Sequence, residues 1–194
     1  MKPFEEYVEE ANRAHGHMCA GQILGLRLAL HGLALLGVED PTGRDRKRLV
    51  TFVEIDRCAT DAVTVVTGCR IGKRALKFRD FGKVAATFVD LAGGRAVRVV
   101  ARDTSKQLAR ERYPEMADRN QQQMKAYREL SDAELFSHQW VTVNIPPEDL
   151  PGWKGQKAVC AACGETINFH REVVRDGRTV CRACAGESYY TLVP

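Results

Sequence analysis

Apolar residues in the first forty positions recur at helical spacing and predict two helices. The first helix is short and amphipathic, and its apolar face consists of Phe4, Tyr7, Val8 and Ala11. It should end near the glycine of the sequence HGH at residues 15–17. The second helix, residues 22–36, is apolar almost all round and is ended by Gly37. Because its polar face is so small, this helix must be buried on most sides.

Runs rich in β-branched residues predict strands further along the chain. The expected strands are residues 49–57, 84–89 and 96–100. The last two are joined through LAGGR, a hairpin signal because paired glycines accept positive φ. Thr60 or Asp61 is expected to cap a short helix that runs through Thr67. Repeated strand–helix alternation is absent, so the pattern predicts an α+β fold with a core of helices and antiparallel sheet.

The composition changes beyond this region. Residues 105–130 are rich in Arg, Gln and Glu with a few apolar positions at helical intervals, which predicts an exposed helical segment. A strand is expected at residues 140–145, and the sequence PPEDLPG after it predicts a stiff linker. We therefore expect two domains, a core domain over residues 1–150 and a separate unit over residues 151–194.

Composition and charge narrow the class of protein. The chain has 194 residues, of which 44% are hydrophobic and 28% charged, as in a folded protein. The net charge is only +4, and the basic cluster at residues 44–48 is expected to be a solvated loop, so nucleic acid is not an expected partner. Arg27 and His31 interrupt the longest apolar stretch, so no membrane span is predicted. With no secretory signal visible, we expect a cytoplasmic protein with reduced thiols.

Four of the seven cysteines form a metal-binding pattern. They make two C-x2-C pairs with 17 residues between them, namely Cys160, Cys163, Cys181 and Cys184. Four thiolates complete the tetrahedron that Zn²⁺ prefers and leave no position for a substrate, so the predicted site is structural. Two disulfides are the alternative. The segment resembles zinc fingers of the treble-clef, DksA/TraR type.

A second cluster of metal-binding residue types lies near the N-terminus, in the sequence HGHMC at residues 15–19. His15, His17 and Cys19 offer imidazole and thiolate donors, which suit Zn, Fe, Ni or Cu rather than Mg or Ca. The cluster precedes a predicted helix, whose N-terminus lowers a thiol pKa and favours an anion. Buried polar packing without a ligand role is the alternative interpretation.

Further candidate residues lie on the first expected strand. If residues 49–58 are extended, Glu54, Asp56 and Cys58 share one face, which could line a polar pocket. A carboxylate there could orient a ligand histidine or act as a general base, and an exposed strand face is the alternative. The sequence TGCRIGK at residues 67–73 is not a phosphate loop, because its glycines are one residue too close together and Arg74 follows.

These blocks together resemble the methanogenesis-related FmdE family, named for a component of formylmethanofuran dehydrogenase. The resemblance covers residues 10–100 and rests on HGHMCAGQILGLRLA and EIDRCATDAVTVVTGCRIGKRALKFRDFGKVAATF. It implies an α+β core, a C-terminal treble-clef zinc finger, dimerisation and a second metal site near the HGHxC block. The residues to which it assigns roles are His15, His17, Cys19, Cys58, Asp61, Cys69 and Lys73. Ala20 stands where the family often has proline.

The expected cofactors are a structural Zn²⁺ in the finger and a second transition metal, Zn, Ni or Fe, in the core. His15, His17, Cys19 and Cys58 are the expected core ligands, and Asp61 joins His17, Cys19 and Cys58 as a candidate catalytic group. Three functions stay open: an accessory or redox-linked component of a complex, a small free-standing metalloenzyme, and a zinc-finger regulator of nucleic acid or polymerase. The expected partners are a second copy of the chain, in a homodimer, and a larger oxidoreductase complex.

Overall fold

The computed structural model describes residues 1–193 and divides the chain into two compact units. The first is Met1–Asn144 and the second begins at Ile145. The structural boundary therefore lies ahead of residue 150, because the extended chain after the last core strand already belongs to the second unit. Each unit is described by itself below.

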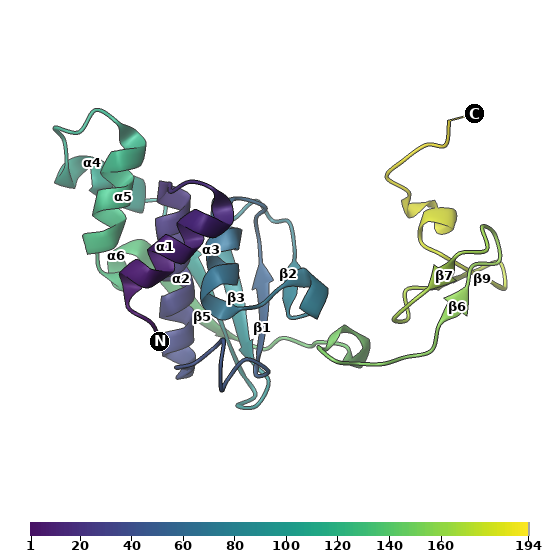
Figure 1. Cartoon of the computed structure of the whole chain (residues 1–194). Helices are drawn as coiled ribbons and strands as arrows, with labels where there is room; N and C mark the ends of the chain where they lie inside the picture. The colour runs from purple at the N-terminus through teal and green to yellow at the C-terminus, as the bar shows by residue number, and fades with distance from the viewer. Residues whose placement is uncertain (194) are drawn as a thin grey trace. The chain divides into compact units, whose positions relative to one another are not determined.

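The first unit is the core domain, and it combines helices with one mixed sheet (Figure 1). Its helices are α1 (Phe4–His15), α2 (Ala20–Leu36), α3 (Cys58–Thr67), α4 (Ser105–Arg112), α5 (Arg119–Glu129) and α6 (Asp132–Leu135), with a 3-10 turn, η1 (Ile71–Lys73). Its strands are β1 (Leu49–Val53), β2 (Leu76–Phe78), β3 (Ala85–Asp90), β4 (Arg95–Ala101) and β5 (Phe136–Val141). The α+β prediction is confirmed.

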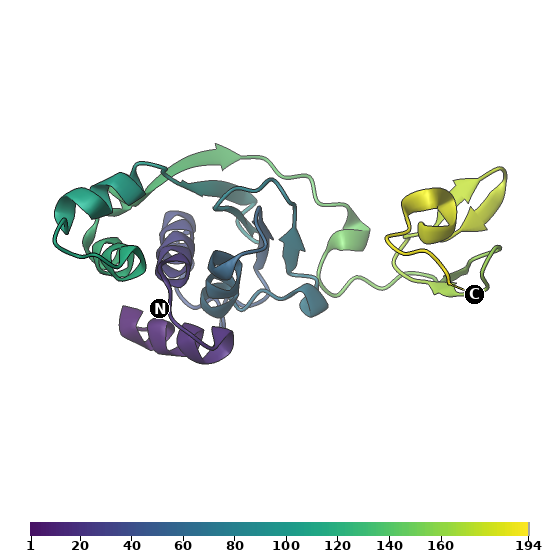
Figure 2. The ribbon, with the colours of Figure 1, turned by 90° about the horizontal axis from the view of Figure 1, so that it is seen from above.

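The sheet has five strands in the order β2-β1-β3-β4-β5. Strands β1 and β2 run parallel and are linked through α3, whereas the other neighbouring strands are antiparallel. Helices α1, α2, α3 and α5 lie on the same side of this sheet (Figure 2). The sheet therefore buries one face against helices, and α3 connects its only parallel pair.

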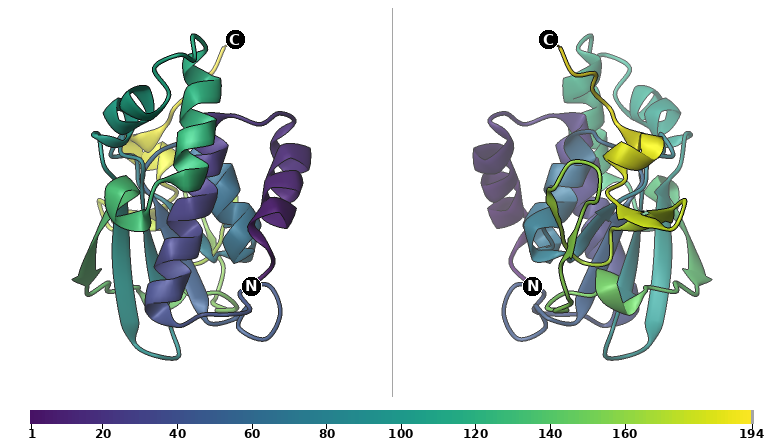
Figure 3. Two further views of the ribbon diagram at one scale, coloured as in Figure 1. Left: turned by 90° about the vertical axis from the view of Figure 1, so that its left-hand side faces the viewer. Right: turned by 90° about the vertical axis from the view of Figure 1, so that its right-hand side faces the viewer.

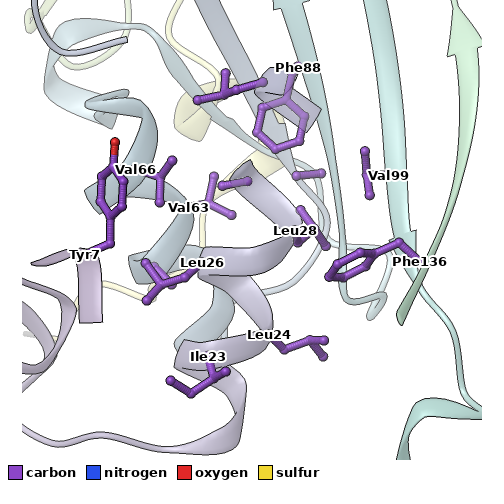
Figure 4. Close-up of a cluster of buried hydrophobic side chains, with 14 of the residues drawn as sticks. Tyr7, Ile23, Leu24, Leu26, Leu28, Val63, Val66, Phe88, Val99 and Phe136 are labelled. Atoms are coloured by element: carbon purple, nitrogen blue, oxygen red, sulfur yellow. The ribbon is translucent and has the colours of Figure 1, made fainter. Parts of the chain in front are cut away.

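Helix α2 lies in the middle of the helical layer (Figure 3). It contacts α3 and α5 beside it and β3 and β4 below it. In the close-up of Figure 4, its buried Leu24, Leu26 and Leu28 lie among side chains from α3, β3 and β4. The near-complete burial expected for this apolar helix is thus provided by the chain itself.

Two glycines of α2 permit these close contacts. A Cβ on Gly25 would lie 2.5 Å from the carbonyl oxygen of Ala59, and one on Gly32 would lie 2.3 Å from the ring of Phe88. The first contact sets the spacing between α2 and α3, and the second sets the spacing between α2 and β3. Both distances are far below van der Waals contact, so only glycine fits.

The sequence located several element ends correctly. Helix α1 ends at Gly16 and α2 at Gly37, with φ angles of +88° and +71° that glycine adopts without strain. Strands β3 and β4 form the predicted antiparallel hairpin. The strand expected at residues 140–145 is β5, which lies a few residues earlier.

Other predicted boundaries were wrong. The first strand ends at Val53, and after a bend α3 begins at Cys58, so Thr60 and Asp61 lie inside the helix instead of capping it. The segment at residues 105–130 divides into α4 and α5, because Pro114 lies in the connection and disfavours helix there. These two helices also pack together and are not simply exposed. Strand β2 was not predicted.

The second unit is a small finger built from short hairpins. Its elements are η2 (Pro147–Asp149), β6 (Ala158–Val159), β7 (Thr166–Ile167), β8 (Val173–Arg175), β9 (Arg178–Val180) and the helical turn η3 (Ala183–Glu187). Strand β6 pairs with β7 and β8 with β9, both antiparallel. Cys160, Ile167 and Val180 form its small core. A unit with so few buried residues needs a further source of stability.

Among the described residues, no helix combines the length and the apolar character that crossing a bilayer requires.

Candidate metal centres

The four finger cysteines converge on one point. The sulfur atoms of Cys160, Cys163, Cys181 and Cys184 all lie within 4.8 Å of one another. The separation of the Cys163 and Cys181 sulfurs, 4.0 Å, is close to the roughly 3.8 Å expected between thiolates of a tetrahedral zinc site. All four cysteines are free thiols and form no disulfide, so the geometry fits one Zn²⁺ with four sulfur ligands.

The surroundings of the finger thiols also suit a cation. Backbone N–H groups, that of Cys163 first and that of Cys181 next, lower the pKa of Cys160 to about 6 and favour its thiolate. The neighbouring sulfurs, Cys181 foremost, raise the pKa of Cys184 to about 12. Four thiolates this close together repel one another, and a central Zn²⁺ removes that repulsion. The donor set therefore fits the structural zinc predicted from the spacing.

The second cluster lies where α1 gives way to α2. His15 is the last residue of α1, Gly16 turns the chain in a left-handed conformation, and Cys19 is the residue before α2. This turn brings the donor atoms of His15, His17 and Cys19 within 4.8 Å of one another. The two imidazole rings are 4.6 Å apart between centroids. Two nitrogens and one sulfur form an incomplete coordination shell for a transition metal.

His15 is held in the orientation of a metal ligand. Its Nδ1 atom lies 2.8 Å from the Oδ2 atom of Asp61, which comes from the first turn of α3. In the neutral tautomer whose Nδ1–H donates a hydrogen bond to this carboxylate, Nε2 carries no proton and its lone pair is free. Nε2 is buried and has no hydrogen-bond partner within residues 1–193. A histidine oriented by a carboxylate is the usual environment of a metal-bound imidazole.

Cys58 lies beside the cluster but outside the set of three mutually close donors. It is the first residue of α3, and a Cβ on Gly21 would lie 3.2 Å from the Cys58 Cβ and 3.7 Å from the Cys19 sulfur. Burial, together with the neighbouring Cys19 thiol, raises the pKa of Cys58. Two thiols at the starts of two packed helices therefore face the same region.

The proposed sharing of a strand face by Glu54, Asp56 and Cys58 was wrong, because the strand ends at Val53. Glu54 is buried and makes a bidentate ion pair with Arg98, with both contacts at 2.6 Å. Asp56 is exposed. Glu54 therefore has a structural role in the sheet.

The two remaining family positions are not among the cluster's donors. Cys69 is buried in the core, where the Thr51 hydroxyl donates to its sulfur at 3.4 Å and burial raises its pKa. Lys73 is exposed at the end of the 3-10 turn η1. The structure thus brings together His15, His17, Cys19, Cys58 and Asp61 and leaves Cys69 and Lys73 outside.

A cleft of about 490 Å³ opens beside this cluster. Its lining residues are His15, Val53, Ile55, Asp56, Arg57, Cys58, Thr60, Asp61, Ile71, Leu76 and Phe78. Sequence reasoning missed Ile71, Leu76 and Phe78, because they come from a single helical turn and a three-residue strand that carry no strong periodic signal. Val53 and Ile55, in contrast, lie in the strand expected at residues 49–57.

Two family models match the chain. Residues 14–137 match the model described as "FmdE, Molybdenum formylmethanofuran dehydrogenase operon". Residues 155–190 match the model described as "Prokaryotic dksA/traR C4-type zinc finger". The two matches fall on the core domain and on the finger, respectively.

Individual proteins are similar as well. A protein of Archaeoglobus fulgidus named "Probable S-adenosyl-L-methionine-binding protein" is 31% identical over 202 residues, covering 94% of this chain and 53% of that protein. The chain thus spans about half the length of this curated relative. The crystal structure described as a "tungsten formylmethanofuran dehydrogenase subunit e (fmde)-like protein" from Syntrophus aciditrophicus matches with a TM-score of 0.65 and 22% identity, covering 97% of this chain and 95% of that one. At that identity the likeness concerns the fold.

Proposed function

Because the chain belongs to the FmdE family and carries a C4-type zinc finger, we propose that it is a metal-binding accessory protein related to the FmdE component of formylmethanofuran dehydrogenase. In this proposal the finger zinc is structural. The core cluster of His15, His17 and Cys19 holds a second transition metal, Zn, Ni or Fe.

The main observation in support of a metal at the core site is the hydrogen bonding of the His15 ring. Its Nδ1 is engaged by Asp61, while its buried Nε2 has no partner in the described structure. A buried nitrogen left unpaired costs free energy, about 1–3 kcal/mol, unless something binds it. A metal held jointly with His17 and Cys19 would satisfy that nitrogen and use the orientation that Asp61 imposes.

A small metalloenzyme is the second candidate, favoured by the cleft. Three close protein donors leave at least one coordination position open, which distinguishes catalytic from structural zinc sites. The cleft reaches His15, Cys58 and Asp61, so a bound molecule could approach that position. Asp61, with its carboxylate on His15, would then act by orienting the ligand.

Metal counting tests the core site. Protein purified without added metal should contain two metal ions per chain, and His17→Ala and Cys19→Ser should each contain one. The controls are His138→Ala, an exposed histidine of β5, and Cys69→Ser, a thiol outside both clusters; each should retain two metals. Unchanged metal content in both cluster variants would show that the cluster is buried polar packing.

We also propose that the chain forms a homodimer and that this homodimer is part of a larger oxidoreductase complex. Helix α2 gives no support for a dimer, since the chain itself covers most of its apolar surface. The support is the family and strand β5, an edge strand whose residues 137–140 are exposed and include neither proline nor a charged Lys, Arg, Asp or Glu. Unprotected edges of this kind favour pairing with another chain. Light scattering should give twice the chain mass of 21.6 kDa; a single-chain mass contradicts the proposal.

A further inference from the structure

We propose that the cleft beside the core cluster binds a small organic molecule with an apolar body and one anionic metal-binding head group, a thiolate or a carboxylate. The head group would occupy the open position of the core metal, and the body would lie along the cleft. The inference therefore rests on the proposed metal site for the head group but not for the apolar body.

The position of the cleft in the fold is that of a ligand site. It lies at the carboxyl ends of the parallel strands β1 and β2, represented by Val53 and Phe78, and at the start of the connecting helix α3. Strand–helix–strand units commonly bind ligands outside the carboxyl ends of their parallel strands. The volume of about 490 Å³ is within the usual range for small-molecule sites.

The walls of the cleft differ in polarity according to the element that supplies them. The segment from β1 onward, the turn η1 and strand β2 supply its five large apolar side chains, namely Val53, Ile55, Ile71, Leu76 and Phe78. Ile71 is 69% exposed and Phe78 is 40% exposed. Adjacent apolar side chains left open to water at a concave site indicate a surface that an apolar ligand covers.

The polar lining residues come from α1, from the segment before α3 and from the start of α3. Asp61 is engaged by His15, and the Thr60 hydroxyl donates to the carbonyl oxygen of Ile55, so both are committed within the protein. His15 Nε2 is the buried atom without a partner in the described chain. Beside these three residues, a ligand therefore meets the proposed metal position at His15 and not a free carboxylate or hydroxyl.

The charge of the head group follows from Arg57. This residue precedes α3 and lines the cleft, and its guanidinium makes no ion pair within the part of the chain that the structure describes. The N-terminus of α3 adds partial positive charge on the same side. Asp56 also lines the cleft, and its negative charge would repel a second anionic group, so a ligand with one anionic group near Arg57 and the metal is favoured.

Titration calorimetry with two homologous series tests this inference. The probes are straight-chain thiols from ethanethiol to hexanethiol and carboxylates from acetate to octanoate, added to the full metal-loaded chain. Each methylene buried is worth about 0.8 kcal/mol, so the association constant should rise about fourfold per carbon until the cleft is filled. Affinity independent of chain length would overturn the inference.

Variants locate the effect. Phe78→Asp and Ile71→Asp should abolish the chain-length dependence while the metal content stays at the wild-type value. Phe81→Asp is the matched control, since Phe81 is 63% exposed, follows Phe78 by three residues and does not line the cleft. Both cleft positions are exposed enough to accept a carboxylate, and Ile71→Asp alone suffices if Phe78→Asp fails to fold. A chain-length dependence that both variants retain would place the apolar body elsewhere and refute the cleft.

The metal-free variant separates the two proposals. In Cys19→Ser, loss of the core metal should weaken every probe by a similar factor and leave the chain-length dependence intact. If wild-type protein has no core metal but still shows that dependence, the proposed metal site and the head-group assignment fail and the apolar cleft stands. If the core metal is present and the dependence is absent, the proposed function stands and the cleft inference fails.

Discussion

The contact between α2 and α3 at Gly25 gives a prediction that links packing to the core site. In Gly25→Ala, the new Cβ would lie 2.5 Å from the carbonyl oxygen and 2.7 Å from the Cα of Ala59, and 2.8 Å from the Cβ of Ala62. Two of these atoms are backbone atoms, so a rotamer change cannot relieve the overlap. The two helices must move apart.

The magnitude follows from two opposing effects. Alanine improves helix propensity by about 1 kcal/mol, whereas overpacking a well-filled core costs about 1–3 kcal/mol and occasionally more. Because two of the overlapping atoms belong to the backbone, the overpacking cost lies at the upper end of this range. We therefore expect a net destabilisation of about 1–2 kcal/mol, which lowers the melting temperature of a domain of this size by about 2–8 °C. Because Cys19 precedes α2 and Cys58 begins α3, the same movement should weaken core-metal binding.

Gly32→Ala is the matched control. Its Cβ would clash with the ring of Phe88 on β3 and not with α3, so it should also destabilise the domain but leave the core metal bound. Thermal unfolding followed by far-UV circular dichroism measures stability, and metal analysis after dialysis against a chelator measures binding. A Gly25→Ala protein with wild-type melting temperature and wild-type metal retention would refute the reasoning.

Three further predictions address single contacts. Asp61→Asn should weaken core-metal affinity about 10–100-fold at nearly unchanged stability, because His15 loses its orienting carboxylate. Competition with a chromogenic chelator measures this affinity, and a variant with the wild-type affinity would contradict the prediction. Cys163→Ser should remove only the finger zinc, so metal analysis that finds both metals still bound argues against the four-sulfur site. Hydrogen bonds from His31, the larger cause, and from Arg27 lower the pKa of Asp132 from its usual 3.8 to about 2. That stabilisation is present above about pH 4 and is lost as the pH falls toward 2, so the urea midpoint of wild-type protein should fall more steeply there than that of Asp132→Asn; parallel profiles would exclude the effect.

Local sequence signals determined how much of the fold could be predicted. Gly16 and Gly37 predict helix ends, and LAGGR predicts a hairpin, because glycines favour the left-handed backbone conformation of these turns without contacts to distant residues. The change from strand to helix between Val53 and Cys58 has no such signal. Arg57, the residue before α3, makes no side-chain cap, and Glu54 is stabilised by Arg98 from another strand, which the sequence alone does not reveal.

The same distinction applies to the candidate site. His15, His17 and Cys19 lie within five residues, so their proximity was predictable from the sequence. Cys58 was predicted beside them for the wrong reason, since it reaches the cluster from the start of a helix and not from a strand face. The part of the apolar wall that β2 supplies could not be predicted, because β2 has only three residues and pairs in parallel with β1, from which α3 separates it along the chain.

The residues around the two candidate metal centres are separated by different lengths of chain, and this difference affects the order in which the two sites can form. All four finger ligands lie in one short segment, so few long loops must close before zinc can be held. The core site is different: three donors lie in one pentapeptide, but Asp61 comes from 46 positions further on. During synthesis the pentapeptide emerges first and the orienting carboxylate much later, after β1 and the start of α3. If the proposed core metal is captured early by the N-terminal donors, it would be held loosely until α3 docks, and slow metal exchange would then mark completed folding of the domain.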